Sequence, residues 1–312
     1  MTERLFIQPG KQFRPFSSQA GIHCRGCSLP LPRVIVDFGA DHAFGRVPEK
    51  LQEHYGVSVA TSTIRVVTER HANQMLEQEK MAQTVPDKAG CTQQVGFITG
   101  SMIPIMTADE QAFDKRKNQT LQWKEARLSL VHEQGSVTPK FGVVFQGSVD
   151  DAGQSLLNSA ILAGFGQQTY LHALGDGAPW IASPVQEKFG TQGSYLVDFY
   201  HVYDILAAAS SFCAIDIEPN SWFQAQKIAL KNNEYSDVIN NLKPYIETDD
   251  IPDKQAPVRV CHRYLSNRTD QLDYKTAIEK ALPIGSGEIE SAHRYVIQER
   301  MKLPGAWWKA AL

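Results

Sequence analysis

The feature that most constrains this chain is a strand, turn, helix and strand pattern over residues 169–202. Residues 170–174 (YLHAL) form an almost continuous apolar run that stops at Gly175-Asp176-Gly177. Such a run is typical of a strand buried on both faces and closed by a tight turn. Residues 195–197 repeat the strand pattern, and residues 178–189 between them are long enough for one crossover helix. The pattern therefore predicts two parallel strands in a right-handed βαβ unit.

This unit places two acids in equivalent positions. Asp176 and Asp198 are expected at the carboxyl ends of neighbouring strands, where open α/β sheets place their sites. The alternative is that both are ordinary turn residues, because Asp beside Gly is common turn chemistry. The position of the two acids alone makes the stretch a candidate site, with two turn residues as the alternative.

Size and hydropathy indicate a globular protein. The chain has 312 residues, of which 42% are hydrophobic and 21% charged, which is enough for two or three domains. We find no secretory signal and no apolar stretch close to the ~18–20 residues of a membrane span. A cytoplasmic protein without membrane contact is expected.

The charge is unevenly distributed along the chain. The formal net charge is −3, yet residues 1–36 and 254–312 are both basic, with an acidic cluster at residues 247–253. Basic ends permit contact with nucleic acid. Among the five cysteines, Cys24 and Cys27 form one CRGC pair, and a zinc site needs four ligands. Reduced, unliganded thiols are the simpler interpretation.

A helix-turn-helix pattern follows the irregular basic segment that we predict for residues 1–33. Val47–Tyr55 has helical apolar spacing and is followed by Gly56, which allows a left-handed turn. A second helical face begins near residue 60, and Thr61, Ser62 and Arg65 at its start would face base edges or phosphates. An ordinary helical hairpin has the same local pattern. We assign residues 34–90 to this region.

The periodicity changes to that of strands after residue 90. The sequence predicts two apolar runs hinged at Gly100 within residues 95–106, and further strands at residues 123–132 and 141–145. It predicts an amphipathic helix at residues 151–164. Three strands, a helix, a strand, a helix and a strand are the layout of the ribonuclease-H-like fold, although periodicity also allows another α/β sheet. We assign residues 91–202 to this core.

The chain is then helical over a long distance. Phe199–Cys213 is a strong helix, and more helices are expected within residues 203–280. The phrase LPIGSGEIESAHRYVIQERMK follows, with a Gly-Ser-Gly entry into a final helix within residues 281–312. Glu290 and Arg294 lie one turn apart on that helix, and an exposed salt bridge is their alternative interpretation.

Several phrases together resemble bacterial insertion-sequence transposases of the Kra type, relatives of the mutator-like DDE transposases. The phrases are GSMIPIM, WKEARL, LGDGAPWI, YLVDFYHV and PIGSGEIESAHRYVIQERMKLPGAWW. The resemblance extends from about residue 34 to the C-terminus. It implies a ribonuclease-H-like core, an all-helical insertion between the second Asp and the Glu, and end binding, strand cleavage and strand transfer in DNA transposition.

The resemblance also implies functional residues. Asp176 matches the second acid, Glu290 the third, and Asp198 with His201 the Asp-x-x-His signature. Asp176 and Glu290 would hold Mg²⁺ or Mn²⁺ in a two-ion site. The resemblance implies double-stranded DNA as the partner and a homodimer or higher oligomer in a synaptic complex. It also implies a location at the nucleoid. DNA contacts are expected at the start of the second helix and also at Trp180, Trp222, Arg294 and Lys302.

The first acid is where this chain departs from the family. Its position is occupied by Thr99, in ITGSMIP. A neutral hydroxyl is a poor Mg²⁺ ligand, so metal binding and cleavage should be weakened severely. Asp109 and Asp114 lie downstream and are the candidate replacements for the first acid, but neither lies in a strand followed by Gly as the family pattern requires. The final family phrase also ends early here, which suggests a shortened copy.

Three functions stay open on this basis. The first is a catalytically impaired transposase. The second is a non-catalytic DNA-binding protein that acts as a repressor or end-binding factor of a mobile element. The third is an unrelated α/β enzyme that uses Gly175-Asp176-Gly177 as a phosphate turn, although no P-loop or GxGxxG context accompanies it.

Overall fold

The computed structural model describes residues 6–8, 11–13, 19, 30–81, 83–108, 118–214, 218–302 and 308–309. The chain divides into two compact units. The helical unit comprises Met1–Met81 and Gln298–Ala306, and the sheet unit comprises Ala82–Ile297 and Trp307–Leu312. No helix within the described ranges is long and apolar enough to cross a membrane.

The helical unit is built around three helices. They are α2 (Pro30–Asp41), α3 (Val47–Tyr55) and α4 (Thr61–Lys80), and the unit also contains a short antiparallel pair, β1 (Phe6–Gln8) and β2 (Lys11–Phe13), and a final turn, α13 (Glu299–Met301). The apolar faces of the three helices share one core, formed by Ile35, Val47, Leu51, Ile64 and Val67. Gly56 ends α3 in the left-handed conformation, at φ 65°, as predicted. The helix α2 was not predicted, and it begins inside the segment expected to be irregular.

The sheet unit contains a mixed sheet, so the described part of the chain is α/β. Its strands are β3 (Gln93–Ala108), β4 (Gln119–Glu133), β5 (Lys140–Phe145), β6 (Tyr170–Gly175), β7 (Gly193–Val197) and β8 (Trp308–Lys309). The order is β5-β4-β3-β6-β7, and β8 pairs with β3 at residues 105–106. The pairs β3–β4 and β4–β5 are antiparallel, whereas β3–β6 and β6–β7 are parallel. The predicted element sequence and the parallel βαβ unit are confirmed. The predicted hinge is wrong, because β3 pairs with β4 without interruption through Gly100.

Two helices cover one face of this sheet. They are α5 (Val149–Leu162) and α6 (Pro179–Phe189), and α6 leads into a 3-10 turn at Gly190–Gln192. The helix α5 begins with a capping box, in which the Ser148 hydroxyl accepts from the Asp151 amide and the Asp151 carboxylate accepts from the Ser148 amide. The buried cluster between these helices and the sheet consists of Val131, Leu156, Leu157, Ala160, Phe165, Leu171, Ala173, Val185 and Phe189.

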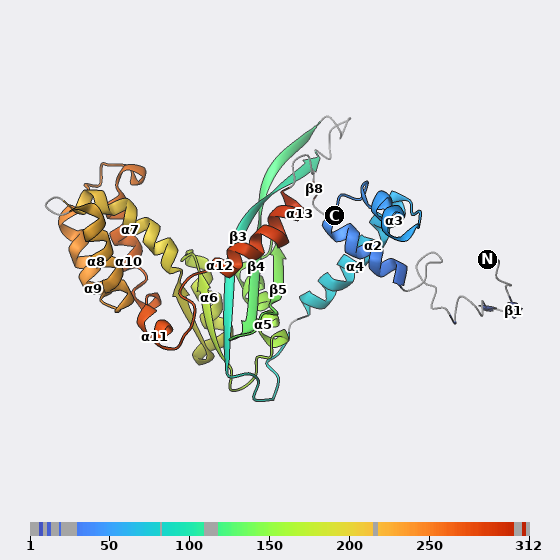
Figure 1. The fold of residues 1–312 in the computed structure, drawn as a ribbon, viewed down its shortest axis with the longest axis horizontal. Coiled ribbons are helices and arrows are strands. Elements are labelled where there is room, and N and C mark those ends of the chain that lie inside the picture. Colours follow the sequence, from blue (N-terminus) through green and yellow to red (C-terminus); the bar gives the residue numbers. More distant parts are fainter. Residues whose placement is uncertain are drawn as a thin grey trace. The chain divides into compact units, whose positions relative to one another are not determined.

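The predicted helical segment after β7 is also observed (Figure 1). It comprises α7 (Phe199–Cys213), α8 (Pro219–Lys231), α9 (Tyr235–Leu242), α10 (Pro257–Ser266) and α11 (Tyr274–Glu279), with 3-10 turns at Lys243–Tyr245, Asp253–Gln255 and Thr269–Gln271. We call residues 199–280 the helical insertion. In it α7 packs against α8 and α10, and α9 packs against the same two helices. The chain then enters α12 (Gly287–His293) and a π-helical turn, Arg294–Gln298.

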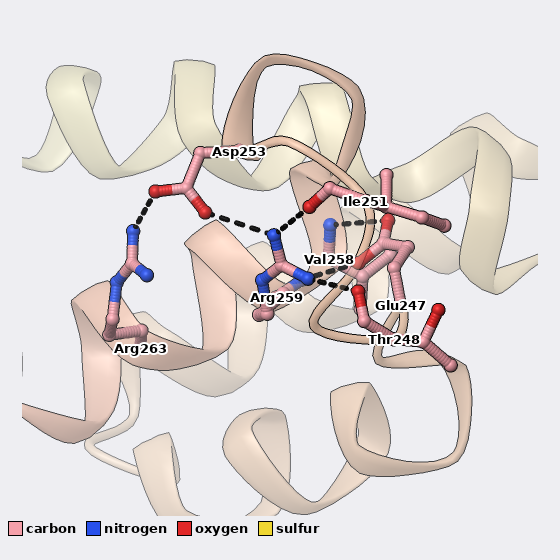
Figure 2. A network of polar contacts seen from close by, with 7 residues as sticks. All are labelled: Glu247, Thr248, Ile251, Asp253, Val258, Arg259 and Arg263. Atoms are coloured by element: carbon pink, nitrogen blue, oxygen red, sulfur yellow. Dashed lines mark hydrogen bonds and ion pairs between the residues drawn. The ribbon is translucent and has the colours of Figure 1, made fainter.

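The acidic linker before α10 is an ordered part of the insertion (Figure 2). Glu247 accepts hydrogen bonds from the backbone amides of Val258, at 3.1 Å, and Arg259, at 2.7 Å, which satisfies the free N–H groups at the start of α10. The Arg259 guanidinium donates to the carbonyls of Thr248 and Ile251 and, at 3.0 Å, to the Asp253 carboxylate. The predicted acidic cluster therefore caps and braces a helix.

Candidate functional site

Two parallel strands, β6 and β7, end level with each other beside the interior of β3. Phe97 of β3 is paired with Leu174 of β6, so two residues further on Thr99 is level with Asp176. The strands are still adjacent there, because a Cβ built on Gly175 would lie 3.2 Å from the Ile98 carbonyl oxygen. The next pair along, Gly175 with Val197, is followed directly by Asp176 and Asp198.

Side-chain alternation along β3 puts Thr99 on the face that α12 covers. Phe97 stacks on His132 of β4, with ring centroids 6.4 Å apart, and His132 Nε2 lies 2.9 Å from the Glu288 carboxylate of α12. Thr99 shares the face of Phe97, because successive strand residues alternate. On β6, His172 donates from Nε2 to the Pro283 carbonyl at 2.9 Å, so its ring contacts the segment that leads into α12. Thr99 therefore lies on the face of β3 that α12 covers, and Asp176 directly follows the last residue of β6.

The third acid of the predicted set, Glu290, lies on α12. This helix packs against β3 and β4 through its buried residues Ile289 and Ala292. Glu290 itself is exposed, as is Asp176. The structure thus brings the helix of Glu290 onto the face of β3 that carries Thr99. That the carboxylates of Asp176 and Glu290 face one pocket stays a prediction.

Asp198 holds the segment before α12 in place. Its Oδ1 accepts from the Tyr200 amide at 2.7 Å, which caps α7, and its Oδ2 accepts from the amide of Ser286 at 3.1 Å and from the Ser286 hydroxyl. The Phe199 amide donates to the Ile284 carbonyl at 2.8 Å. Both carboxylate oxygens of Asp198 are therefore engaged in joining the end of β7 to the Gly-Ser-Gly entry.

The turn after β6 carries Asp176 outward. Gly177 has φ 78°, a conformation that favours glycine, and its amide donates to the Tyr195 hydroxyl at 3.0 Å. The Ala178 amide donates to Asp176 Oδ1 at 2.9 Å. Burial raises the pKa of Tyr195 well above its usual value, so its hydroxyl stays protonated at neutral pH.

One residue of α10 and one just after its C-terminal end also hold this turn, and neither was predicted from the sequence. Tyr264 donates to the Asp176 carbonyl, and Arg268, just after the helix, donates to the Gly177 carbonyl. They follow the turn by 88 and 91 residues, so no local spacing relates them to it. His201, of the predicted Asp-x-x-His signature, is exposed on α7 and packs against the Tyr264 ring at 5.7 Å between centroids.

The predicted DNA contacts of the helical unit are on the surface. Thr61, Ser62 and Arg65 are exposed in the first turns of α4. Arg65 lies 3.9 Å from Glu69, and both side chains are more than half exposed, so the pairing leaves the guanidinium accessible. Arg294 and Lys302 are exposed as well.

The two predicted base-stacking tryptophans differ in environment. Trp180, on α6, is half-buried, and the Arg127 guanidinium lies 4.5 Å from its ring centroid. Trp222, on α8, is 8% exposed and packs inside the helical insertion, so its ring face is not available for stacking in this structure. Trp180 is therefore partly exposed while it packs against the cluster of Ile98, Ala152 and Ile181, whereas Trp222 belongs to a core.

The residues present fit a two-ion metal site poorly. No group of three His, Cys, Asp or Glu side chains that could hold a metal ion occurs among the described residues. Thr99 adds no charge, and both oxygens of Asp198 are already hydrogen-bonded. Asp109, Asp114, Cys24 and Cys27 lie outside the described residues, so the substitute acids and the zinc interpretation stay untested.

A cavity of about 510 Å³ lies elsewhere, at the free edge of β7. It is bounded by β6, β7, α6 and residues 270–282, and its polar lining includes His172, Asp270, Asp273 and Lys280. None of Thr99, Asp176 and Glu290 lines it. The cavity and the predicted acidic site are therefore separate features.

Comparison with protein-family models and with curated protein sequences finds no match to this chain.

Proposed function

We propose that this chain is a DDE transposase homologue with a ribonuclease-H-like core, which binds DNA ends and whose strand-cleavage site is incomplete. The observation that carries this proposal is the strand order β5-β4-β3-β6-β7, in which Thr99, inside β3, is level with Asp176 just beyond the end of β6. The core begins with two antiparallel pairings and continues with two parallel ones, which is the arrangement expected for that fold. The helix of Glu290 covers the face of β3 that carries Thr99.

The missing carboxylate explains why the site is incomplete. Two-ion cleavage needs hard, negatively charged oxygen ligands that hold the cations beside the scissile phosphate. Thr99, level with Asp176, occupies the position at which a carboxylate would help to hold the cations, and its hydroxyl carries no charge. The remaining acids, Asp176 and Glu290, are exposed, and they would be the only two carboxylates of the predicted set left to hold the cations. The native chain is therefore expected not to cleave DNA strands.

The helical unit supports the DNA-binding part of the proposal. The short α3, the left-handed Gly56 and the exposed start of α4 follow the helix-turn-helix arrangement, in which the second helix reads the major groove. This part does not depend on Thr99. An end-binding or repressing factor is therefore the second candidate function, and the substitution at Thr99 is the observation that favours it.

Restoring the first acid tests the catalytic part. We would compare the native chain with Thr99→Asp and with the neutral, similarly sized control Thr99→Asn for nicking of supercoiled plasmid in Mg²⁺ and Mn²⁺. We expect nicking only with Thr99→Asp, and its loss when Asp176→Asn is added. Folded Thr99→Asp protein that never nicks would count against the site. Strong nicking by the native chain that Asp109→Ala or Asp114→Ala abolishes would show that the first acid lies elsewhere.

Selection from a random duplex pool tests DNA binding. We expect a preferred sequence to emerge, and Arg65→Ala to weaken binding to it about 5- to 150-fold, equivalent to the ~1–3 kcal/mol of a base-reading arginine. Lys227→Ala, on α8 of the sheet unit, removes the same charge and should have no such effect. Equal losses in the two variants would indicate attraction by net charge only.

A further inference from the structure

The backbone of the Asp176 turn is hydrogen-bonded at each of its central polar groups. The Gly177 amide donates to Tyr195 and the Ala178 amide to Asp176 Oδ1. The two carbonyls, of Asp176 and Gly177, accept from Tyr264 and Arg268. A turn beyond the end of a strand is ordinarily among the more mobile parts of a sheet. This one is tied on one side to β7 and on the other to the helical insertion.

The contacts from the insertion are short and mutually supporting. Tyr264 Oη donates to the Asp176 carbonyl at 2.8 Å. Arg268 donates from Nε and Nη2 to the Gly177 carbonyl at 2.9 and 2.7 Å, and from Nη1 to the Tyr264 carbonyl at 3.0 Å. The guanidinium carbon of Arg268 also lies 3.9 Å from the centre of the Tyr264 ring. Planar, charged donors of this kind give stronger and more directional hydrogen bonds than neutral ones.

The turn itself is shaped for this contact. A Cβ built on Gly177 would lie 2.1 Å from Tyr264 Oη and 3.1 Å from Arg268 Nε, so only glycine admits α10 at this distance. Burial raises the pKa of Tyr264, which keeps its hydroxyl protonated and therefore a donor. The His201 ring packs against the Tyr264 ring from α7.

We propose that Tyr264 and Arg268 are positioning residues, which fix the direction of the Asp176 carboxylate through the backbone of its turn. This inference rests on the proposed function for the role of Asp176 as a site acid. Oδ1 is held by the Ala178 amide of the same turn, so the carboxylate follows the backbone that Tyr264 and Arg268 hold. The helical insertion thereby sets the geometry of the acid, and a ligand that moves α10 would move Asp176.

Hydrogen exchange of the full-length protein tests the contact without requiring activity. We would follow the peptide covering residues 174–181 in the native chain, in Tyr264→Phe, which removes only the hydroxyl, and in Arg268→Met. The matched control is Arg263→Met on α10, whose guanidinium bonds Asp253 at 2.6 Å instead of the turn. Both test variants should raise exchange of the turn amides at least tenfold, with no change in α5, and the control should not.

A catalytic readout separates positioning from mere packing. In the Thr99→Asp chain with Mn²⁺, Tyr264→Phe should lower the maximal nicking rate about tenfold with plasmid affinity unchanged. Arg268→Met should also lower this rate. Arg268→Lys should recover only part of it, because one ammonium group cannot reproduce two guanidinium donors. Unchanged turn exchange in Tyr264→Phe and Arg268→Met, or the same change in Arg263→Met, would overturn the inference. Failure of Thr99→Asp to nick would instead refute the proposed function, and the exchange result would still decide the contact.

Discussion

Removal of the Asp198 carboxylate should destabilise the sheet unit strongly. Asp198 is 8% exposed and accepts three hydrogen bonds, from the amides of Tyr200 and Ser286 and from the Ser286 hydroxyl. In Asp198→Ala, loss of the helix cap costs about 1 kcal/mol. The Ser286 amide, in a residue that is 5% exposed, would lose its acceptor at a further cost of ~1–3 kcal/mol. The expected total is roughly 3 kcal/mol in the free energy of unfolding.

The asparagine variant separates the cap from the anchor. In Asp198→Asn one oxygen can still cap α7, whereas the amide group presents donors toward Ser286, so a loss of about 1–2 kcal/mol is expected. The assay is equilibrium urea unfolding, with Asp204→Ala as control, because Asp204 is exposed on the same helix. The control should change stability by no more than ~0.5 kcal/mol. A loss below about 1 kcal/mol in Asp198→Ala, or equal losses in both variants, would refute this reasoning.

Two further predictions concern the turn and the acidic linker. Gly177→Ala should destabilise the chain by more than Gly135→Ala. Both glycines have positive φ, at 78° and 82°, but of the two only Gly177 has other atoms within 4 Å of an added Cβ. Urea unfolding of both variants should show the difference, and equal losses of stability would contradict it. Burial acts to raise the pKa of Glu247, but the amides of Arg259 and Val258 and the Arg259 charge outweigh it, so the pKa is lowered from 4.5. Because the pKa is lowered in the folded state, ionised Glu247 stabilises the fold above pH 4.5, and this stabilisation is lost as the pH falls through the folded-state pKa. The melting temperatures of the native chain and of Glu247→Gln should therefore converge as the pH falls below 4.5, and a constant difference would contradict the assignment.

The local structure of this chain follows from its sequence. Phe199–Cys213 and Val47–Tyr55 are helices with the predicted bounds, and the Gly56 turn has the predicted conformation. Hydrogen bonds within helices and their caps join residues only a few positions apart, so periodicity and capping residues are sufficient to predict them. The parallel pairing of β6 and β7 was predictable for a related reason, because a connection of that length allows a crossover helix.

The distant partners of the site residues were decided by tertiary structure alone. Asp198 was predicted as a site acid, and its oxygens are engaged with Tyr200 and with Ser286, 88 residues later. Trp222 was predicted to stack on a base, and packing of α8 in the insertion buries it. Tyr264 and Arg268 were missed, since nothing in PVRVCHRYLSNR refers to a turn so far away in the chain. Which helix face meets which turn depends on how the helices pack, and that packing is set by the whole buried surface rather than by any local pattern.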